Sequence, residues 1–244
     1  QRCQMVTWLK LKCLMMVNLY MIGFMVLYLP VLFQSSTKKN SWVKLHSEKW
    51  AHFVLKNLRL NMTLNGLENQ TDAEGRHLFI ISNHISWADI PSILVAFQHK
   101  LGFVAKAELT RIPVLHYWMR QIGCIFINRK KHREAMRALH HLESKDQFTR
   151  IVLFPEGTRS KNGKIGSLKP GGLKIAWSLG ALIQPVHIKG TRESWEGRSD
   201  LKAHQGSLKI FPALDLASLK ENGMTFVELL SKIQLMLQEE NGDI

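Results

Sequence analysis

Cysteines and acidic residues are both scarce in this sequence of 244 residues. The three cysteines, Cys3, Cys13 and Cys124, are an odd number and lie far apart. They offer neither a disulfide framework nor a metal knuckle, which fits a reducing compartment. Asp and Glu number 19 against 33 Lys and Arg, so the formal net charge is +14. This excess of positive charge suggests an anionic partner. The candidates are a nucleic acid, a membrane surface and a phosphorylated substrate.

Several patterns that carry chemistry are also missing. The sequence has no G-x-S-x-G elbow of a serine hydrolase, and its eleven histidines include no H-E-x-x-H or comparable metal spacing. Gly157 and Gly163-Lys164 resemble a P-loop, but five residues separate the glycines and Ile165 stands where Ser or Thr would bind magnesium. Cys124 lies in an apolar run and is interpreted as a core thiol. We therefore expect no metal, no cofactor and no nucleotide hydrolysis.

The N-terminal region contains a long stretch without charge. Residues 13–33 carry no charged side chain, and as a helix they would run roughly 30 Å at about 1.5 Å per residue, enough to span a bilayer. Basic residues flank both ends, which fits two ends resting on an anionic cytoplasmic surface. A cleaved signal peptide is the alternative, but no A-x-A-like site follows Phe33. Because the sequence opens on Gln1, we also expect an altered or trimmed start.

A second helical pattern covers residues 41–60. Tryptophans and aliphatic side chains recur at helical spacing among lysines, as in an interfacial membrane helix, although a core-packing helix would show the same pattern. Residues 1–60 hold nine Lys and Arg and one acid, Glu48. Because the charge gathers around apolar sequence and no nucleic-acid-binding motif is present, we expect a phospholipid membrane and no nucleic acid as partner. We divide the chain into a membrane-associating two-helix segment, 1–60, and an α/β domain, 61–244.

The pattern changes after residue 60. The stretch 59–66 alternates and ends in the turn signal Asn65-Gly66. Short apolar runs then recur with helical segments between them, which predicts a mixed, mostly parallel sheet with helices on both faces. The expected strands are 78–82, 103–105, 124–127, 151–154, 182–188 and 207–211. The expected helices lie near 89–98, 113–122, 131–145, 170–180 and 224–239.

The stretch "NHISWAD" places His84 after a strand and Asp89 five residues later. A spacing of five does not bring two side chains to one helix face, so the pair meets only if the backbone bends between them. At such a strand-to-helix turn the carboxylate would fix the imidazole tautomer and leave the other nitrogen as a base. The alternative is a surface histidine followed by an N-capping aspartate.

A second group of polar residues follows the apolar run 151–154. Glu156, Gly157, Thr158 and Arg159 arrive together, and glycine, hydroxyl and guanidinium groups suit a bound oxyanion. Lys106 and Arg129 close two other expected strands at the same sheet edge, so an anion site is plausible there. A charged surface turn with ordinary surface cations is the alternative.

Four blocks in order carry a family resemblance: "NHISWAD", "GCIFINR", "FPEGTRS" and "IQPVHI". Residues 76–190 resemble the glycerolipid acyltransferases, most closely the bacterial 1-acyl-sn-glycerol-3-phosphate acyltransferases with their NHx4D motif. The resemblance implies that His84, supported by Asp89, takes the proton of the sn-2 hydroxyl of lysophosphatidic acid. It implies a phosphate site at Arg159 with Thr158, Gly157 and Glu156 shaping the loop, to which we add Lys106 and Arg129.

The resemblance also implies the other participants. The acyl donor would be acyl-CoA or acyl-carrier protein, the product phosphatidic acid, and the location the cytoplasmic face of the inner membrane. Pro185 falls in the block that the family associates with donor binding or support of the site. Asn128 and "SLKPGG" depart from the commoner family pattern, which bears on specificity more than on the reaction. Two other functions stay open: acylation of another lysophospholipid or an ornithine lysolipid, and a non-catalytic membrane-surface binding module.

Overall fold

The computed structural model describes residues 2–73, 75–97, 101–128, 150–160 and 162–238. The described residues form an eight-stranded sheet in the order β1-β7-β6-β2-β5-β3-β4, with β8 pairing β6 beside this path. Pairing is parallel except where β7 and β8 meet β6. The strands are β1 (Leu60–Asn65), β2 (Leu78–Ser82), β3 (Gly102–Lys106), β4 (Ile125–Ile127), β5 (Arg150–Leu153), β6 (Leu182–Lys189), β7 (His204–Ile210) and β8 (Leu214–Asp215).

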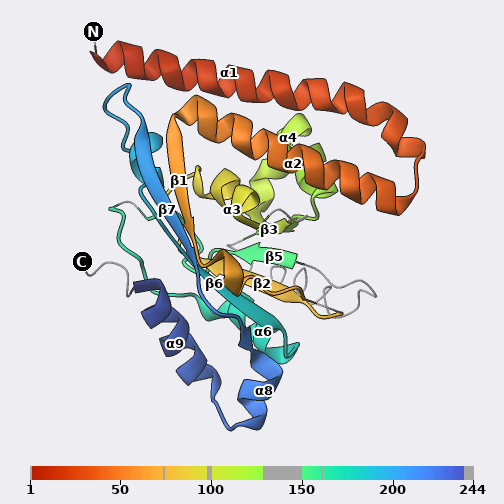
Figure 1. Ribbon diagram of the computed structural model, residues 1–244, viewed down its shortest axis with the longest axis vertical. Helices are drawn as coiled ribbons and strands as arrows, with labels where there is room; N and C mark the ends of the chain where they lie inside the picture. The colour runs from red at the N-terminus through yellow and green to blue at the C-terminus, as the bar shows by residue number, and fades with distance from the viewer. Residues whose placement is uncertain (1, 74, 98–100, 129–149, 161, 239–244) are drawn as a thin grey trace.

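Helices surround the sheet (Figure 1). Those of the described ranges are α1 (Arg2–Tyr28), α2 (Ser36–Leu58), α3 (Asp89–Phe97), α4 (Pro113–Gln121), α6 (Pro170–Ser178), α7 (Thr191–Ser194), α8 (Leu216–Glu221) and α9 (Phe226–Gln238), with short 3-10 turns at Leu29–Phe33, Leu67–Asn69 and Ala107–Arg111. The expected helix 131–145 lies outside the described residues. The other strands and helices expected after residue 60 are present within a few residues of their predicted bounds. Three described helices and strands were not predicted, namely the four-residue α7, the six-residue α8 and the two-residue β8.

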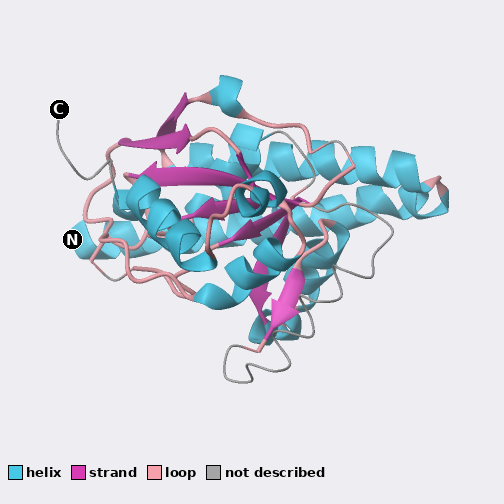
Figure 2. Ribbon diagram, turned by 90° about the horizontal axis from the view of Figure 1, so that it is seen from below, coloured by secondary structure: helices cyan, strands magenta, loops and turns pink. Residues whose placement is uncertain are grey.

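The central strand β2 shows why helices cover both faces. Phe79 and Ile81 point to one side and join a buried cluster with residues of α6 and α9, whereas Leu78 and Ile80 join a second cluster with residues of α3. Because side chains alternate along a strand, a continuous apolar run is buried only between two layers. Figure 2 shows the sheet edge-on between its helices. The predicted mixed α/β fold with helices on both faces is confirmed.

The first two helices form a hairpin that lies along α3 and α4 (Figure 1). Ser35 caps α2 by accepting a hydrogen bond from the Lys38 N–H, and α2 buries one face that includes Ala51 and Val54. The core-packing alternative therefore holds for one face of α2. The predicted division into two parts at residue 60 stays a prediction. The helix α2, which precedes this boundary, packs against α3, which follows it.

The outer side of α1 is strongly apolar. Within the described residues, 4–33 is long and apolar enough to cross a membrane and is mostly exposed. The helix is longer than the uncharged stretch, since it begins at Arg2 and includes Lys10 and Lys12. Its exposed large side chains are Met5, Trp8, Leu11, Leu14, Met15, Leu19, Ile22, Val26 and Leu27. An apolar surface of this extent is typical of a segment that contacts lipid or another protein.

Candidate active site

Five parallel strands, β6, β2, β5, β3 and β4, end at the same edge of the sheet. In open α/β sheets this carboxyl edge is where ligands bind. His84 follows β2, Phe154 and Glu156 follow β5, and Thr191 follows β6. The sheet therefore brings together side chains that lie up to about one hundred residues apart in the chain.

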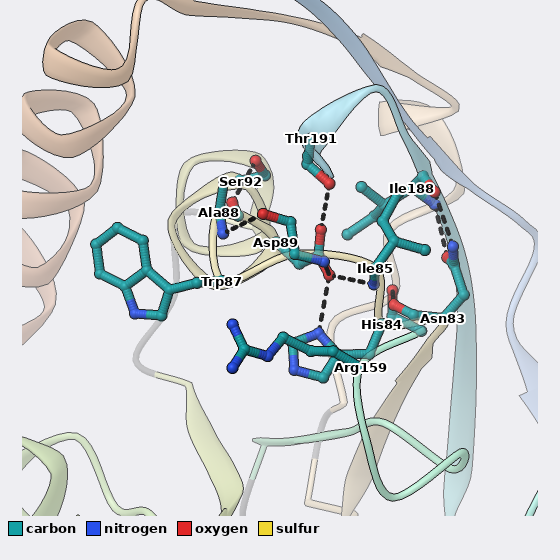
Figure 3. Close-up of polar contacts among 12 residues, drawn as sticks. Asn83, His84, Ile85, Trp87, Ala88, Asp89, Ser92, Arg159, Ile188 and Thr191 are labelled. Carbon is teal, nitrogen blue, oxygen red and sulfur yellow. Dashed lines mark hydrogen bonds and ion pairs between the residues drawn. The ribbon is translucent and has the colours of Figure 1, made fainter. Parts of the chain in front are cut away.

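His84 and Asp89 contact each other as the sequence predicted. The imidazole Nδ1 lies 2.8 Å from Asp89 Oδ2 (Figure 3). The same oxygen accepts the N–H groups of Ile85 at 2.8 Å and Ser86 at 2.9 Å, which bends the backbone so that residues five apart meet. The His84 side chain is only 13% exposed and the Asp89 side chain is fully buried, so the alternative of a surface histidine is wrong.

The second oxygen of Asp89 is also engaged. Thr191 Oγ1 donates to Oδ1 at 2.5 Å, and both residues are fully buried. Thr191 follows Gly190, whose φ of 78° is one that glycine adopts readily. The Cβ of any other residue at this position would lie 2.3 Å from the Gln205 carbonyl oxygen. The carboxylate thus accepts four hydrogen bonds, which fix its orientation. Thr191 was not predicted from the sequence, because no short motif links it to Asp89.

A pair of hydrogen bonds fixes the base of the turn on β6. The Asn83 side chain donates to the Ile188 carbonyl oxygen at 2.7 Å and accepts the Ile188 N–H at 2.8 Å. Asn83 is itself buried. The segment before His84 therefore cannot shift along β6 without breaking two buried hydrogen bonds, which are costly to leave unmade.

The imidazole of His84 is held on its face as well as at its edge. Its ring stacks on Phe154, with centroids 3.9 Å apart and planes 15° apart. Since Asp89 accepts from Nδ1, the proton of the neutral ring sits there and the lone pair is on Nε2. Among the residues that the structure describes, none hydrogen-bonds Nε2. The ring is arranged to take a proton from a group that approaches Nε2.

Glu156 ties the loop after β5 to the histidine turn. Its Oε1 accepts the His84 N–H at 2.9 Å and its Oε2 accepts the Gly166 N–H at 2.9 Å. The Ser160 N–H in turn donates to the His84 carbonyl oxygen at 2.7 Å. Gly157 has a φ of 70° between these contacts. Glu156 is buried and committed to backbone groups, so it shapes the loop, whereas Thr158 is exposed.

Arg159 is half-exposed beside this turn and pairs with Glu196. Its Nη1 lies 2.6 Å from Glu196 Oε1, an oxygen that also accepts the Trp87 N–H at 2.9 Å. Glu196 Oε2 accepts from the Ser86 hydroxyl at 2.5 Å. Glu196 was missed in the sequence, since it follows the last recognised block and belongs to no motif.

The remaining predicted site residues lie further from the histidine or outside the described ranges. Lys106 ends β3, is half-exposed and pairs with Glu108 at 3.1 Å. Pro185 is buried within β6, opposite Ile81 of β2, and its carbonyl oxygen accepts the Phe211 N–H. Arg129 lies outside the described residues. The structure does not bring Lys106 or Pro185 into contact with His84.

Two other chemistries find no support in the described part of the chain. No group of three or more His, Cys, Asp and Glu side chains within it is placed to hold a metal ion. Burial raises the pKa of Cys124 to about 12, so its thiol is protonated at neutral pH and is a poor nucleophile. The imidazole of His84 is the group best arranged for proton transfer.

Comparisons with known proteins point to one family of enzymes. The Acyltransferase family model matches residues 61–189. A probable 1-acyl-sn-glycerol-3-phosphate acyltransferase of Mycoplasma genitalium is 38% identical over 133 residues, which are 52% of this chain and 49% of the relative. A lyso-ornithine lipid O-acyltransferase of Pseudomonas aeruginosa is 26% identical over 144 residues, 56% of this chain and 55% of the relative. The alignments thus span about half the length of these curated relatives.

A solved structure matches almost the whole chain. The crystal structure of the 1-acyl-sn-glycerophosphate acyltransferase PlsC from Thermotoga maritima is 28% identical, with a TM-score of 0.81. The match covers 98% of this chain and 96% of that chain. It therefore includes the N-terminal hairpin as well as the sheet that carries His84.

Proposed function

Because the chain belongs to the Acyltransferase family, we propose that it acylates the sn-2 hydroxyl of 1-acyl-sn-glycerol 3-phosphate. The donor is an acyl thioester, acyl-CoA or acyl-carrier protein, and the product is phosphatidic acid. The observation that carries the proposal is the His84–Asp89 contact of 2.8 Å through Nδ1, which leaves Nε2 without a hydrogen-bond partner among the described residues. The relatives named as 1-acyl-sn-glycerol-3-phosphate acyltransferases support the choice of acceptor.

His84 acts as the base in this reaction. Its Nε2 takes the proton of the sn-2 hydroxyl as the oxygen attacks the thioester carbonyl carbon. The carbon–sulfur bond then breaks, and the thiolate leaves and is protonated by the imidazolium or by water. A thiol with a pKa of roughly 8.5 is a good leaving group and needs little acid assistance. Asp89 holds the reacting tautomer and stabilises the imidazolium, so no covalent acyl-enzyme is required.

Arg159 binds the phosphate of the acceptor. Its guanidinium uses one N–H on Glu196, which leaves donors in the fork geometry that suits a phosphate. Glu156, Gly157 and Thr158 shape the loop that carries it, and Lys106 adds positive charge at the same sheet edge. Arg129, which lies outside the described residues, is proposed as a further contributor. Pro185 supports the site from within β6, at a distance from the reacting atoms.

The helix hairpin holds the enzyme on a phospholipid membrane. The exposed apolar side of α1 and the lysines along the hairpin fit an anionic bilayer surface. We place the protein on the cytoplasmic face of the inner membrane, where its lipid acceptor and its soluble donor meet. No cofactor, metal or nucleic acid takes part in the proposed reaction.

A second candidate acceptor is an ornithine lysolipid, which the similarity to the Pseudomonas aeruginosa relative favours. The same base chemistry would apply to its hydroxyl. That acceptor carries no phosphate, however, so Arg159 would have no phosphate group to bind. Neutralising Arg159 as Arg159→Gln should raise the KM for lysophosphatidic acid and leave turnover of a phosphate-free acceptor unchanged. The non-catalytic binding module is less well supported, since it gives the His84–Asp89 pair no task.

The test is acyl transfer from labelled acyl-CoA or acyl-carrier protein to lysophosphatidic acid, lyso-ornithine lipid, lysophosphatidylcholine and glycerol 3-phosphate. We expect turnover of lysophosphatidic acid that His84→Ala abolishes and that His52→Ala leaves unchanged, because His52 is an exposed histidine of α2. Transfer to another acceptor alone would keep the chemistry and overturn the substrate. A folded wild type that binds vesicles and transfers nothing from either donor would favour the binding module.

A further inference from the structure

Glu196 contacts both the turn that carries His84 and the loop that carries Arg159. We propose that it is a positioning residue that competes with the acceptor's phosphate for Arg159. In this role it keeps the affinity for phosphate monoesters low. The inference rests on the proposed function, because it assumes that Arg159 receives an anion. It assigns a task to a carboxylate that none of the sequence motifs includes.

The contacts of Glu196 connect the turn that carries the base to the loop that carries the arginine. One carboxylate oxygen lies 2.6 Å from Arg159 Nη1 and accepts the Trp87 N–H at 2.9 Å. The other oxygen accepts the Ser86 hydroxyl at 2.5 Å. Trp87 and Ser86 lie between His84 and Asp89, so Glu196 holds the outer side of the turn that Asp89 holds from inside.

The charges explain why such a contact regulates anion binding. A guanidinium has five N–H donors, and within the described residues Arg159 gives a single one of them to Glu196. A phosphate can approach the remaining donors while Glu196 keeps this one, so it competes with Glu196 for the charge of the guanidinium and not for a single donor. It then meets a negative carboxylate near the same cation, and like charges at short range disfavour each other. A neutral acceptor experiences no such repulsion.

Weak phosphate binding is useful in this reaction. Lysophosphatidic acid and phosphatidic acid carry the same phosphate group, so a strong phosphate site binds substrate and product alike. Uniform binding of this kind lowers KM without lowering the barrier to acyl transfer, and it slows product release. By offsetting part of the charge of Arg159, Glu196 positions the guanidinium beside the turn while letting the product leave.

A purely structural role makes a different prediction, and Glu196→Gln separates the two. Glutamine keeps an oxygen that can accept from Trp87 and Arg159, and its amide can hydrogen-bond the Ser86 oxygen, but the charge is gone. A structural role predicts little change or a general loss of activity. The competition predicts tighter phosphate binding.

The experiment measures calorimetric binding of glycerol 3-phosphate to the full chain in detergent, beside KM and kcat for lysophosphatidic acid. In Glu196→Gln we expect the Kd for glycerol 3-phosphate and the KM to fall together, by about 2- to 10-fold. We expect kcat to stay within about 2-fold or to decrease as product release slows. The matched control is Glu193→Gln, which removes an exposed carboxylate from α7, three residues away. It should leave both constants unchanged.

The double variant Arg159→Gln with Glu196→Gln completes a cycle. In the background without Arg159, removing the Glu196 charge should have no effect on phosphate binding. An effect that persists there, an equal effect of Glu193→Gln, or no binding to either wild type or Glu196→Gln overturns the inference. Weaker binding in Glu196→Gln overturns it as well. Failure of the proposed function would show separately, as a wild type that does not turn over lysophosphatidic acid, because the calorimetric measurement needs no turnover.

Discussion

The ring of His84 lies nearly parallel to that of Phe154, with 3.9 Å between centroids and 15° between planes. Phe154 comes directly after β5, and His84 comes shortly after β2. These two strands are neighbours in the sheet. The stack fixes the plane of the imidazole, and the hydrogen bond to Asp89 fixes its rotation within that plane. Together the two contacts determine where Nε2 points.

Phe154→Leu should lower kcat about 3- to 10-fold with little change in KM. Leucine fills much of the space but does not stack, and such ring contacts contribute about 0.5–1.5 kcal/mol. Steady-state kinetics on lysophosphatidic acid give both constants. Phe226→Leu is the control, since Phe226 is the first residue of α9 and its ring contacts Trp177 of α6 and not His84. Equal losses in the two variants would show a general packing defect and contradict the prediction.

Thr191→Val should reduce kcat about 10-fold, whereas Thr191→Ser should keep most of it. Valine has nearly the shape of threonine but leaves Asp89 Oδ1 without the donor that it has in the wild type, and an unsatisfied buried acceptor costs about 1–3 kcal/mol. Serine restores the hydroxyl. Parallel measurements of kcat and of the free energy of unfolding test this. Full activity in Thr191→Val would mean that the hydroxyl does not hold the carboxylate.

Asp89→Asn should reduce kcat by about three orders of magnitude or more. Asparagine keeps one oxygen but its amide nitrogen cannot accept, so either the Oδ2 donors Ile85 and Ser86 or the Oδ1 donor Thr191 lose their acceptor. Where the amide nitrogen faces His84, the Nδ1–H tautomer is no longer selected. An equivalent change in a Ser-His-Asp triad costs about 10⁴-fold. Asp200→Asn is a matched control, because Asp200 also pairs with a histidine, His204, at 3.2 Å. Circular dichroism of both variants separates lost catalysis from lost folding, and near-normal turnover in Asp89→Asn would refute the assignment.

The ion pair of Arg76 and Asp215 should make stability depend on pH. Hydrogen bonds from Arg76 hold the pKa of Asp215 far below its usual range. A lowered carboxyl pKa stabilises the fold above the unfolded pKa of about 3.9, and this contribution is lost as the pH falls toward the folded value. Because both side chains are partly exposed, we expect Asp215→Asn to cost about 0.5–1 kcal/mol between pH 5 and 7.

Urea unfolding at several pH values measures that difference. The gap between wild type and Asp215→Asn should stay constant from about pH 7 to 5 and shrink below about pH 4. A gap that widens on acidification would contradict the linkage.

The sequence was sufficient for elements that depend on local patterning. The strand predicted at 78–82 has those bounds in the structure, because both faces of β2 are buried and its residues before Ser82 are all apolar. The contact of His84 with Asp89 was also predictable, since the two lie only five positions apart and the strand ends just before. The resemblance of the four blocks to one family reinforced both expectations.

Other parts of the site depend on which strands become neighbours, and no local pattern shows that. Thr191 and Glu196 come to the histidine turn from more than one hundred positions away, because β6 lies beside β2. Phe154 was expected at a strand end, but its stacking on His84 requires β5 on the other side of β2. The strand β8 has two residues and leaves too little periodicity to detect.

The hydrogen bond between Thr191 and Asp89 joins residues 102 positions apart, and the Asn83–Ile188 pair spans 105. During synthesis the histidine turn therefore exists well before its partners do. At about 5–20 residues per second, Thr191 is added about 5–20 s after Asp89. The helix hairpin has already been synthesised throughout that interval. Its apolar outer side is therefore available for binding before Thr191 can support Asp89 and His84. The onset of acyl transfer would then mark the pairing of β6 with β2.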